Sequence, residues 1–257
     1  MLDHAVERLL RRDRLVVLTG LVVMTLLAWA YLVTLTLRMD MGEGVSSMAM
    51  LKSWDALDAA TMFVMWAVMM VGMMVPSATP MVLLYAHVLR SRAGDAEPLV
   101  PTSAFFGGYI SVWIGFSAAA TGLQWGLEQA ALLSPMMVST SPKFAGLILI
   151  AAAAYQWTPL KETCLRHCRS PIWYLSTHWR DRAGGAYLMG LQHGAYCLGC
   201  CWLLMALLFV GGVMNLFTVA AIAIFVLAEK AAPLGRGMGR AGGGVLVIFG
   251  MVMILGL

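Results

Sequence analysis

Three cysteines and a histidine stand close together in the segment HGAYCLGCCW, residues 193–202. In a helix, His193, Cys197, Cys200 and Cys201 would occupy positions i, i+4, i+7 and i+8, which share one face. Met205 continues the same stripe. Thiolates select Cu(I), zinc or iron–sulfur clusters. The segment therefore predicts a soft-metal site that uses two of the three thiols, because adjacent residues cannot both point at one ion.

A second pair, Cys164 and Cys168, lies in CLRHC with His167 between them, again at helical i, i+4 spacing. Structural zinc prefers four Cys or His ligands in soluble loops, whereas these thiols lie within or beside an apolar segment, which favours Cu(I). Two other interpretations stay open. Buried cysteine also packs as a small hydrophobic residue, and Cys197-x-x-Cys200 has the spacing of a redox thiol pair.

Methionine is concentrated between residues 39 and 81, which hold 11 of the 21 methionines. A thioether is a soft ligand that suits Cu(I) and binds without losing a proton. Ordinary packing in an apolar helix explains methionine equally well. Within 59–90 the methionines fall on two faces at helical spacing: Met62, Met65, Met69 and Met73 on one, and Met70, Met74 and Met81 on the other.

The segment before these helical methionines is rich in methionine and acid. Met39, Asp40, Met41 and Glu43 lie there, followed by Met48 and Met50. If the segment faces the outside of the cell, these side chains would capture an arriving metal ion. We take the first four as candidate capture ligands.

Three further positions carry polar or conformational signals inside apolar segments. Pro76, followed by Pro80, removes a backbone donor from a helix and predicts a kink or partial unwinding, which can line a substrate site or simply serve packing. Glu229 and Lys230 are adjacent at the end of an apolar run. Ionisable groups at membrane depth suggest function, although near the interface such a pair can also extend its charges toward water.

Composition identifies the class of protein that must position these residues. Hydrophobic residues make up 61% of the 257 residues and charged residues 12%, against about 25% charged in soluble domains. The mean hydropathy is +0.82. These values exclude a soluble globular enzyme, a disordered regulator and a nucleic-acid binder, and the net charge of +4 follows membrane topology instead.

Seven segments approach the roughly 20 apolar residues that a membrane-spanning helix needs. Backbone groups in lipid must be satisfied internally, so we expect an all-α transmembrane bundle forming one integral membrane domain over residues 1–257. A six-span alternative remains, because the glycine-rich stretch 235–244 could open a hairpin that does not cross fully. The expected spans are 15–37, 59–90, 102–128, 143–159, 185–211, 215–230 and 242–257.

The distribution of Lys and Arg predicts the orientation of these spans. Under the seven-span interpretation, 14 of the 17 basic residues fall in the N-terminal arm and in the second, fourth and sixth loops. Cytoplasmic segments carry such an excess. The N-terminus and all five cysteines are therefore predicted to lie on the cytoplasmic side of a bacterial inner membrane, and the C-terminus outside. Structural disulfides are not expected in the reducing cytosol.

These motifs together resemble a bacterial family of predicted metal-binding integral membrane proteins of unknown function. The resemblance covers residues 60–230 and implies metal binding, while carrying over no reaction. It rests on Trp66, Met69, Met70, Met73, Met74 and Pro76, on YQWTPLKETCLRHCRSP (155–171), on HGAYCLGCCWLLM (193–205), and on Gly212, Asn215, Glu229 and Lys230.

The favoured function is binding, delivery or transport of a soft metal, with Cu(I) preferred and zinc or iron still open. An ion would pass from the methionine-rich segment to the Cys/His cluster. The expected partners are the bilayer, the metal ion, and a soluble copper chaperone or a membrane complex, with no nucleic acid. An enzyme is not the favoured class. The alternatives are a membrane redox enzyme using thiols or a bound metal, and a structural subunit of a membrane complex.

Overall fold

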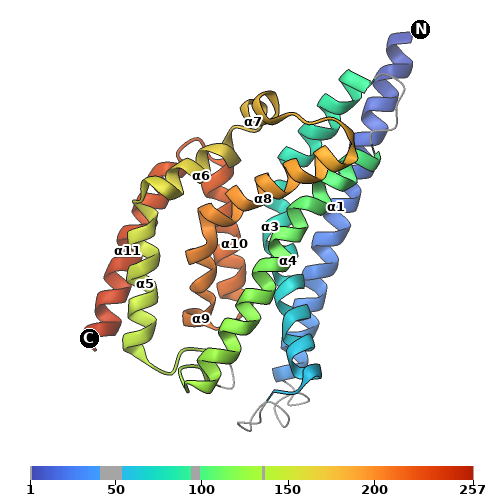
Figure 1. Ribbon diagram of the computed structural model, residues 1–257. Coiled ribbons are helices and arrows are strands. Elements are labelled where there is room, and N and C mark those ends of the chain that lie inside the picture. Colours follow the sequence, from blue (N-terminus) through green and yellow to red (C-terminus); the bar gives the residue numbers. More distant parts are fainter. Residues whose placement is uncertain (1, 41–53, 94–98, 135–136, 257) are drawn as a thin grey trace.

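The computed structural model is an all-helical bundle (Figure 1). It describes residues 2–40, 54–93, 99–134 and 137–256, with side chains from residue 14 onward except at 39, 40 and 93. This part of the chain forms no strand beyond an isolated bridge between Leu133 and Ser139, so the all-α prediction is confirmed. The helices are α1 (Leu2–Asp40), α3 (Ala56–Ala93), α4 (Leu99–Gln129), α5 (Pro142–Gln156), α6 (Pro159–Arg169), α7 (Pro171–His178), α8 (Arg182–Ala206), α9 (Leu208–Gly211), α10 (Leu216–Ala231) and α11 (Gly235–Leu255).

Among the described residues, five helical segments are long and apolar enough to cross a membrane, by length and composition alone. They are 14–38, 56–92, 99–129, 182–211 and 235–255. The other two expected spans correspond to α5 and α10, which have 15 and 16 residues. At about 1.5 Å per residue each is shorter than a 30 Å bilayer core. Seven and six spans therefore both remain predictions.

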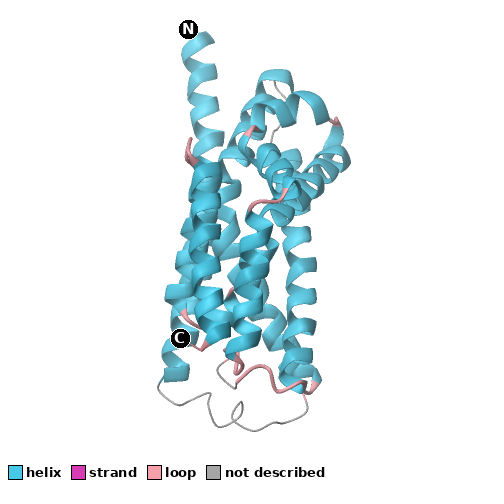
Figure 2. Cartoon of the chain, turned by 90° about the vertical axis from the view of Figure 1, so that its left-hand side faces the viewer, coloured by secondary structure: helices cyan, strands magenta, loops and turns pink. Residues whose placement is uncertain are grey.

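The longer helices run side by side along the bundle, and the short helices α6 and α7 lie at one end of it (Figures 1 and 2). The first helix begins at this same end, whereas the C-terminus lies at the opposite end (Figure 1).

Glycine brings α4 and α8 into close contact. A Cβ at Gly190 of α8 would fall on the carbonyl group of Phe105, and one at Gly108 of α4 would fall on the carbonyl oxygen of Tyr187. Gly194, one turn further along α8, faces Val112 and the backbone of α4. Small residues at this spacing let helix backbones approach closely. The approach holds the cysteine-bearing face of α8 at a fixed register against α4.

Helix α3 continues without interruption through Pro76 and Pro80, so the predicted partial unwinding is wrong. Pro76 lacks the N–H that would bond the carbonyl of Gly72, and the Trp29 indole of α1 donates to that carbonyl at 3.2 Å instead. Ser77 Oγ also donates to the carbonyl of Met74, within the same helix, at 2.9 Å. The Trp29 indole thus replaces one hydrogen bond that proline removes, and the helix stays intact.

The segment 160–184, expected to be a loop, contains α6 and α7. Thr158 caps α6 by accepting a hydrogen bond from the Lys161 amide at 3.3 Å, and Pro159 occupies the first turn. Pro171 similarly opens α7. A threonine cap followed by proline is a helix start signal. Cys164 and Cys168 therefore lie on a helix, α6, and not in an irregular loop.

Candidate metal-binding site

Cysteines from α6 and α8 meet in a single group, which we call the thiol cluster: Cys168, Cys197, Cys200 and Cys201. Hydrogen bonds to the side chains of Cys197 and Cys200 raise the pKa of the Cys168 thiol. Cys197, Cys200 and Cys201 are all at most 1% exposed. All five cysteines of the chain are free thiols. The structure therefore joins two motifs that lie about 30 residues apart in sequence.

Two thiols of the cluster are bonded to their own helix. The Sγ atoms of Cys200 and Cys201 both donate to the carbonyl oxygen of Cys197, each at 3.0 Å. These bonds satisfy a thiol only weakly, so they are readily exchanged for a metal–sulfur bond. A rotation about χ1 would release either sulfur from the backbone.

Cys197 occupies a different environment, because its sulfur contacts a cation. The Lys230 ammonium of α10 donates to Cys197 Sγ at 2.8 Å and to Ser77 Oγ of α3 at 3.1 Å. The Tyr109 hydroxyl of α4 lies 3.2 Å from the same sulfur and also donates to the carbonyl of Met74 at 3.1 Å. An ammonium at this distance favours the charged thiolate. Residues of α10 and α4 thus contact the sulfur of Cys197 on α8, and α3 holds both of them through Ser77 and the Met74 carbonyl.

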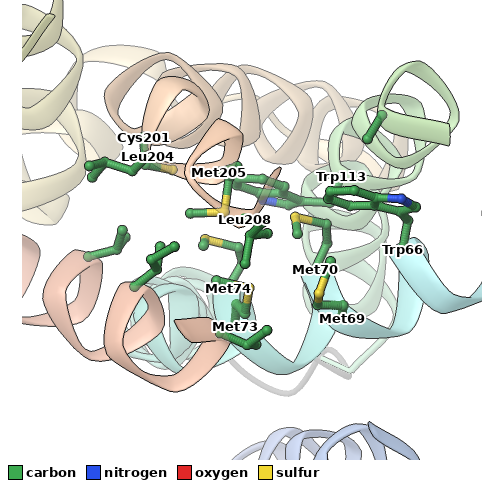
Figure 3. Packing of buried hydrophobic residues seen from close by; sticks show 14 of the residues in the cluster. Trp66, Met69, Met70, Met73, Met74, Trp113, Cys201, Leu204, Met205 and Leu208 are labelled. Atoms are coloured by element: carbon green, nitrogen blue, oxygen red, sulfur yellow. The ribbon is translucent and has the colours of Figure 1, made fainter. Parts of the chain in front are cut away.

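The buried methionines of α3 share the core that holds the thiol cluster. We call Met62, Met65, Met69, Met70, Met73 and Met74 the methionine row; the last five are at most 2% exposed. Figure 3 shows Met70 and Met74 of α3 extending toward Met205 of α8, with Cys201 further along the same core. Met81, predicted on the second face, belongs to a separate core with Tyr85 and Met189.

The cysteine and methionine side chains share one core but do not form a preorganised metal-coordination site. Within the described ranges, no three or more His, Cys, Asp or Glu side chains are arranged to hold a metal ion. Thioethers do not belong to that donor set, and Cu(I) accepts them. Thiol rotation, or a thioether as the third ligand, would be needed to complete a site.

The remaining predicted ligands are placed unequally. His193 is buried between the rings of Phe105, Tyr109 and Tyr174, and its Nδ1 atom has no hydrogen-bond partner. The Cys164 sulfur lies against Gly199 at the edge of the cluster, and burial raises the pKa of this thiol. The predicted capture ligands lie outside what the structure describes: Met41 and Glu43 entirely, and Met39 and Asp40 for their side chains.

Glu229 and Lys230 point to different partners. Glu229 forms a buried ion pair with Lys161 of α6, whose Nζ lies 2.9 and 2.8 Å from the two carboxylate oxygens. Lys230 instead reaches the thiol cluster. Sequence reasoning missed Lys161, Tyr109 and Ser77 as neighbours of these groups, because each comes from a helix remote in sequence.

The fold and these groups define an all-helical protein with a sulfur-rich interior. Residues 63–253 match the model of a family described as copper chaperone (PpoB2). The match covers most of the chain, and the protein belongs to this family. Neither curated proteins nor solved structures gave a match. The family supports a copper-related function, in agreement with the soft ligands predicted from sequence.

Proposed function

We propose that this protein is an integral membrane copper chaperone that holds Cu(I) between α6 and α8. Cys197 of α8 and Cys168 of α6 supply the two thiolates, and Cys200 and Cys201 lie next to them as reserve ligands. Zinc and iron are disfavoured by the thioethers that share this core. The protein delivers its ion to a partner and performs no reaction of its own.

The observation that carries the proposal is the meeting of Cys168 with Cys197 and Cys200 beside the methionine row. Two helices contribute the thiols, so a shift of α6 relative to α8 would open or close the site. A chaperone must release its ion, and a site assembled from two elements can do so more easily than a rigid cage. The weak backbone bonds of Cys200 and Cys201 fit this role.

Lys230 supports the preference for a monovalent ion. Two thiolates and Cu(I) carry a net charge of −1, which the ammonium beside Cys197 neutralises. Zinc in the same two-thiolate site would leave a net charge of +1, and an uncompensated charge is costly in a low-dielectric interior. The contact of 2.8 Å between Lys230 and Cys197 is what supports this step.

The methionine row supports a path toward the thiols through the membrane. Its members run along α3 from Met62 to Met74, and Tyr109 links the Met74 carbonyl to Cys197. We place the thiol end in the cytoplasm of a bacterium, as the basic loops indicate. Cu(I) would then move from thioethers to the more strongly binding thiolates, toward a soluble copper chaperone or a membrane complex.

The test is Cu(I) binding by detergent-purified protein under anaerobic conditions, measured by elemental analysis and by competition with a chromogenic chelator. Wild type is expected to retain about one copper per chain. Cys197→Ser and Cys168→Ser should each weaken binding by at least 100-fold. Cys164→Ser, which removes a thiol at the edge of the cluster, is the matched control and should bind normally.

A further variant distinguishes copper transfer along the methionine row from copper binding at the thiol cluster. Met70→Leu/Met74→Leu conserves volume, so it should keep the fold and the copper stoichiometry while slowing copper uptake into proteoliposomes several-fold. Unchanged binding in both cysteine variants would contradict the site. A visible cofactor spectrum in the purified protein would favour the redox alternative instead.

A further inference from the structure

A second polar site lies away from the thiol cluster, where α5, α6, α10 and α11 meet. A cavity of about 30 Å³ opens there, lined by Gln156, Lys161, Glu229, Arg236 and Arg240 among others. Gly239 of α11 also borders the cavity, and the absence of a Cβ there makes room for the Glu229 carboxylate. We call this space the polar cavity.

Gln156 is the feature that the fold does not explain. Its side chain is 7% exposed, and both amide atoms, Oε1 and Nε2, are buried without a hydrogen-bond partner. Leaving a buried polar group unpaired costs about 1–3 kcal/mol. A leucine would fit an apolar helix contact without that cost, so the amide indicates a group that binds in the cavity.

The surrounding charges favour an anion. Lys161 is paired with Glu229, whereas the Arg236–Glu162 contact is longer, at 3.4 Å, and both side chains are substantially exposed. An exposed pair of this kind is worth about 0–1 kcal/mol, so a stronger acceptor can recruit Arg236. Arg240, one turn further along α11, makes no ion pair with any described residue.

The beginning of α11 adds backbone donors. This helix of 21 residues has no side-chain cap. The amides of Gly235 and Met238 bond to the carbonyls of Ala232 and Leu234, which leaves those of Arg236 and Gly237 as first-turn donors. Helix N-termini favour phosphate and similar anions, and arginine matches phosphate oxygens with a two-pronged hydrogen bond.

We propose that the polar cavity binds a phosphate group. Arg236 and Arg240 near the start of α11 would hold it together with the side-chain amide of Gln156 at the end of α5. The source with this chemistry is either the headgroup of an anionic phospholipid or free inorganic phosphate. The position of the site beside a basic loop predicted to be cytoplasmic is where anionic headgroups concentrate. The proposal does not depend on copper binding.

The experiment measures the Tm of delipidated, detergent-purified full-length protein during titration with phosphatidylglycerol, phosphatidylcholine or inorganic phosphate. We expect phosphatidylglycerol to raise the Tm in a saturable manner, and phosphatidylcholine to have at most a tenth of its apparent affinity. Arg236→Gln/Arg240→Gln should weaken the response at least tenfold. Arg14→Gln/Arg166→Gln is the matched control, because it makes the same change in charge outside the cavity.

Gln156→Leu provides a second readout that a purely structural role would not produce. This variant should raise the Tm of the ligand-free protein and yet weaken the response to phosphatidylglycerol. A response to inorganic phosphate alone, lost in the cavity variants, would support the site with free phosphate as its source. Equal losses in the cavity and control variants, or no saturable response to either phosphate source, would overturn the proposal.

Discussion

The inner helices α3 and α8 differ sharply from the outer helices α1 and α11, although all four are apolar enough to span a membrane. Half of the most apolar window is buried in α3 and in α8, against 17% in α1 and in α11. The methionine row lies on α3, and three of the four thiols of the cluster lie on α8, whereas the fourth, Cys168, comes from α6. Hydropathy therefore identifies helices, while burial against other helices marks those that carry chemistry.

We expect the inner helix α8 to tolerate no added side chain where it contacts α4 closely. Gly190→Val places a side chain on the Phe105 backbone of α4, which backbone movement cannot absorb cheaply. We expect a loss of folded protein, or a destabilisation of several kcal/mol, measured by size-exclusion chromatography and thermal unfolding. Gly244→Val on α11, where a Cβ meets nothing within 4 Å, is the control. Equal behaviour of the two variants would remove the distinction between inner and outer helices.

A smaller change at the centre should alter copper binding and leave the fold intact. Lys230→Met keeps the length of the side chain but removes the ammonium that contacts Cys197. Hydrogen bonds to charged groups contribute about 1.5–3 kcal/mol, so Cu(I) affinity should fall about 10- to 100-fold in the anaerobic competition assay. Lys230→Arg should recover part of the loss. Wild-type affinity in the methionine variant would show that the contact does not serve the site.

The smallest effect is expected where an outer helix supports an inner one. Trp29→Phe removes the indole donor from the Gly72 carbonyl, which Pro76 leaves without its usual partner. We expect a loss of about 1–2 kcal/mol of stability with normal copper binding, measured as a lower Tm. Trp125→Phe, at an exposed site on α4, should change the Tm much less. If Trp125→Phe proved equally damaging, the change in aromatic bulk would be the cause.

Much of the fold could be predicted from sequence, because local patterns determine helices in an apolar chain. Each expected span corresponds to a helix or, for 185–211, to the pair α8 and α9. Most ends lie within a few residues of the prediction, whereas α1 and α11 begin earlier than expected, at Leu2 and Gly235. The errors occurred where local rules compete. Pro76 predicted a kink or partial unwinding, but α3 does not unwind, and the Trp29 indole of α1 donates to the carbonyl that Pro76 leaves without its usual partner. A basic loop proved to contain two short helices started by proline.

The sequence by itself determined the soft-donor chemistry, since residue types and helical spacing suffice to place Cys197, Cys200 and Cys201 on one face. Only the tertiary structure decided which groups surround them. It brought Cys168 to the cluster, directed Lys230 at Cys197 and Glu229 at Lys161, and left the amide of Gln156 without a partner. The physical reason is that contacts between helices depend on packing register. That register is set here by glycines and backbone approach across α4 and α8, which local periodicity does not encode.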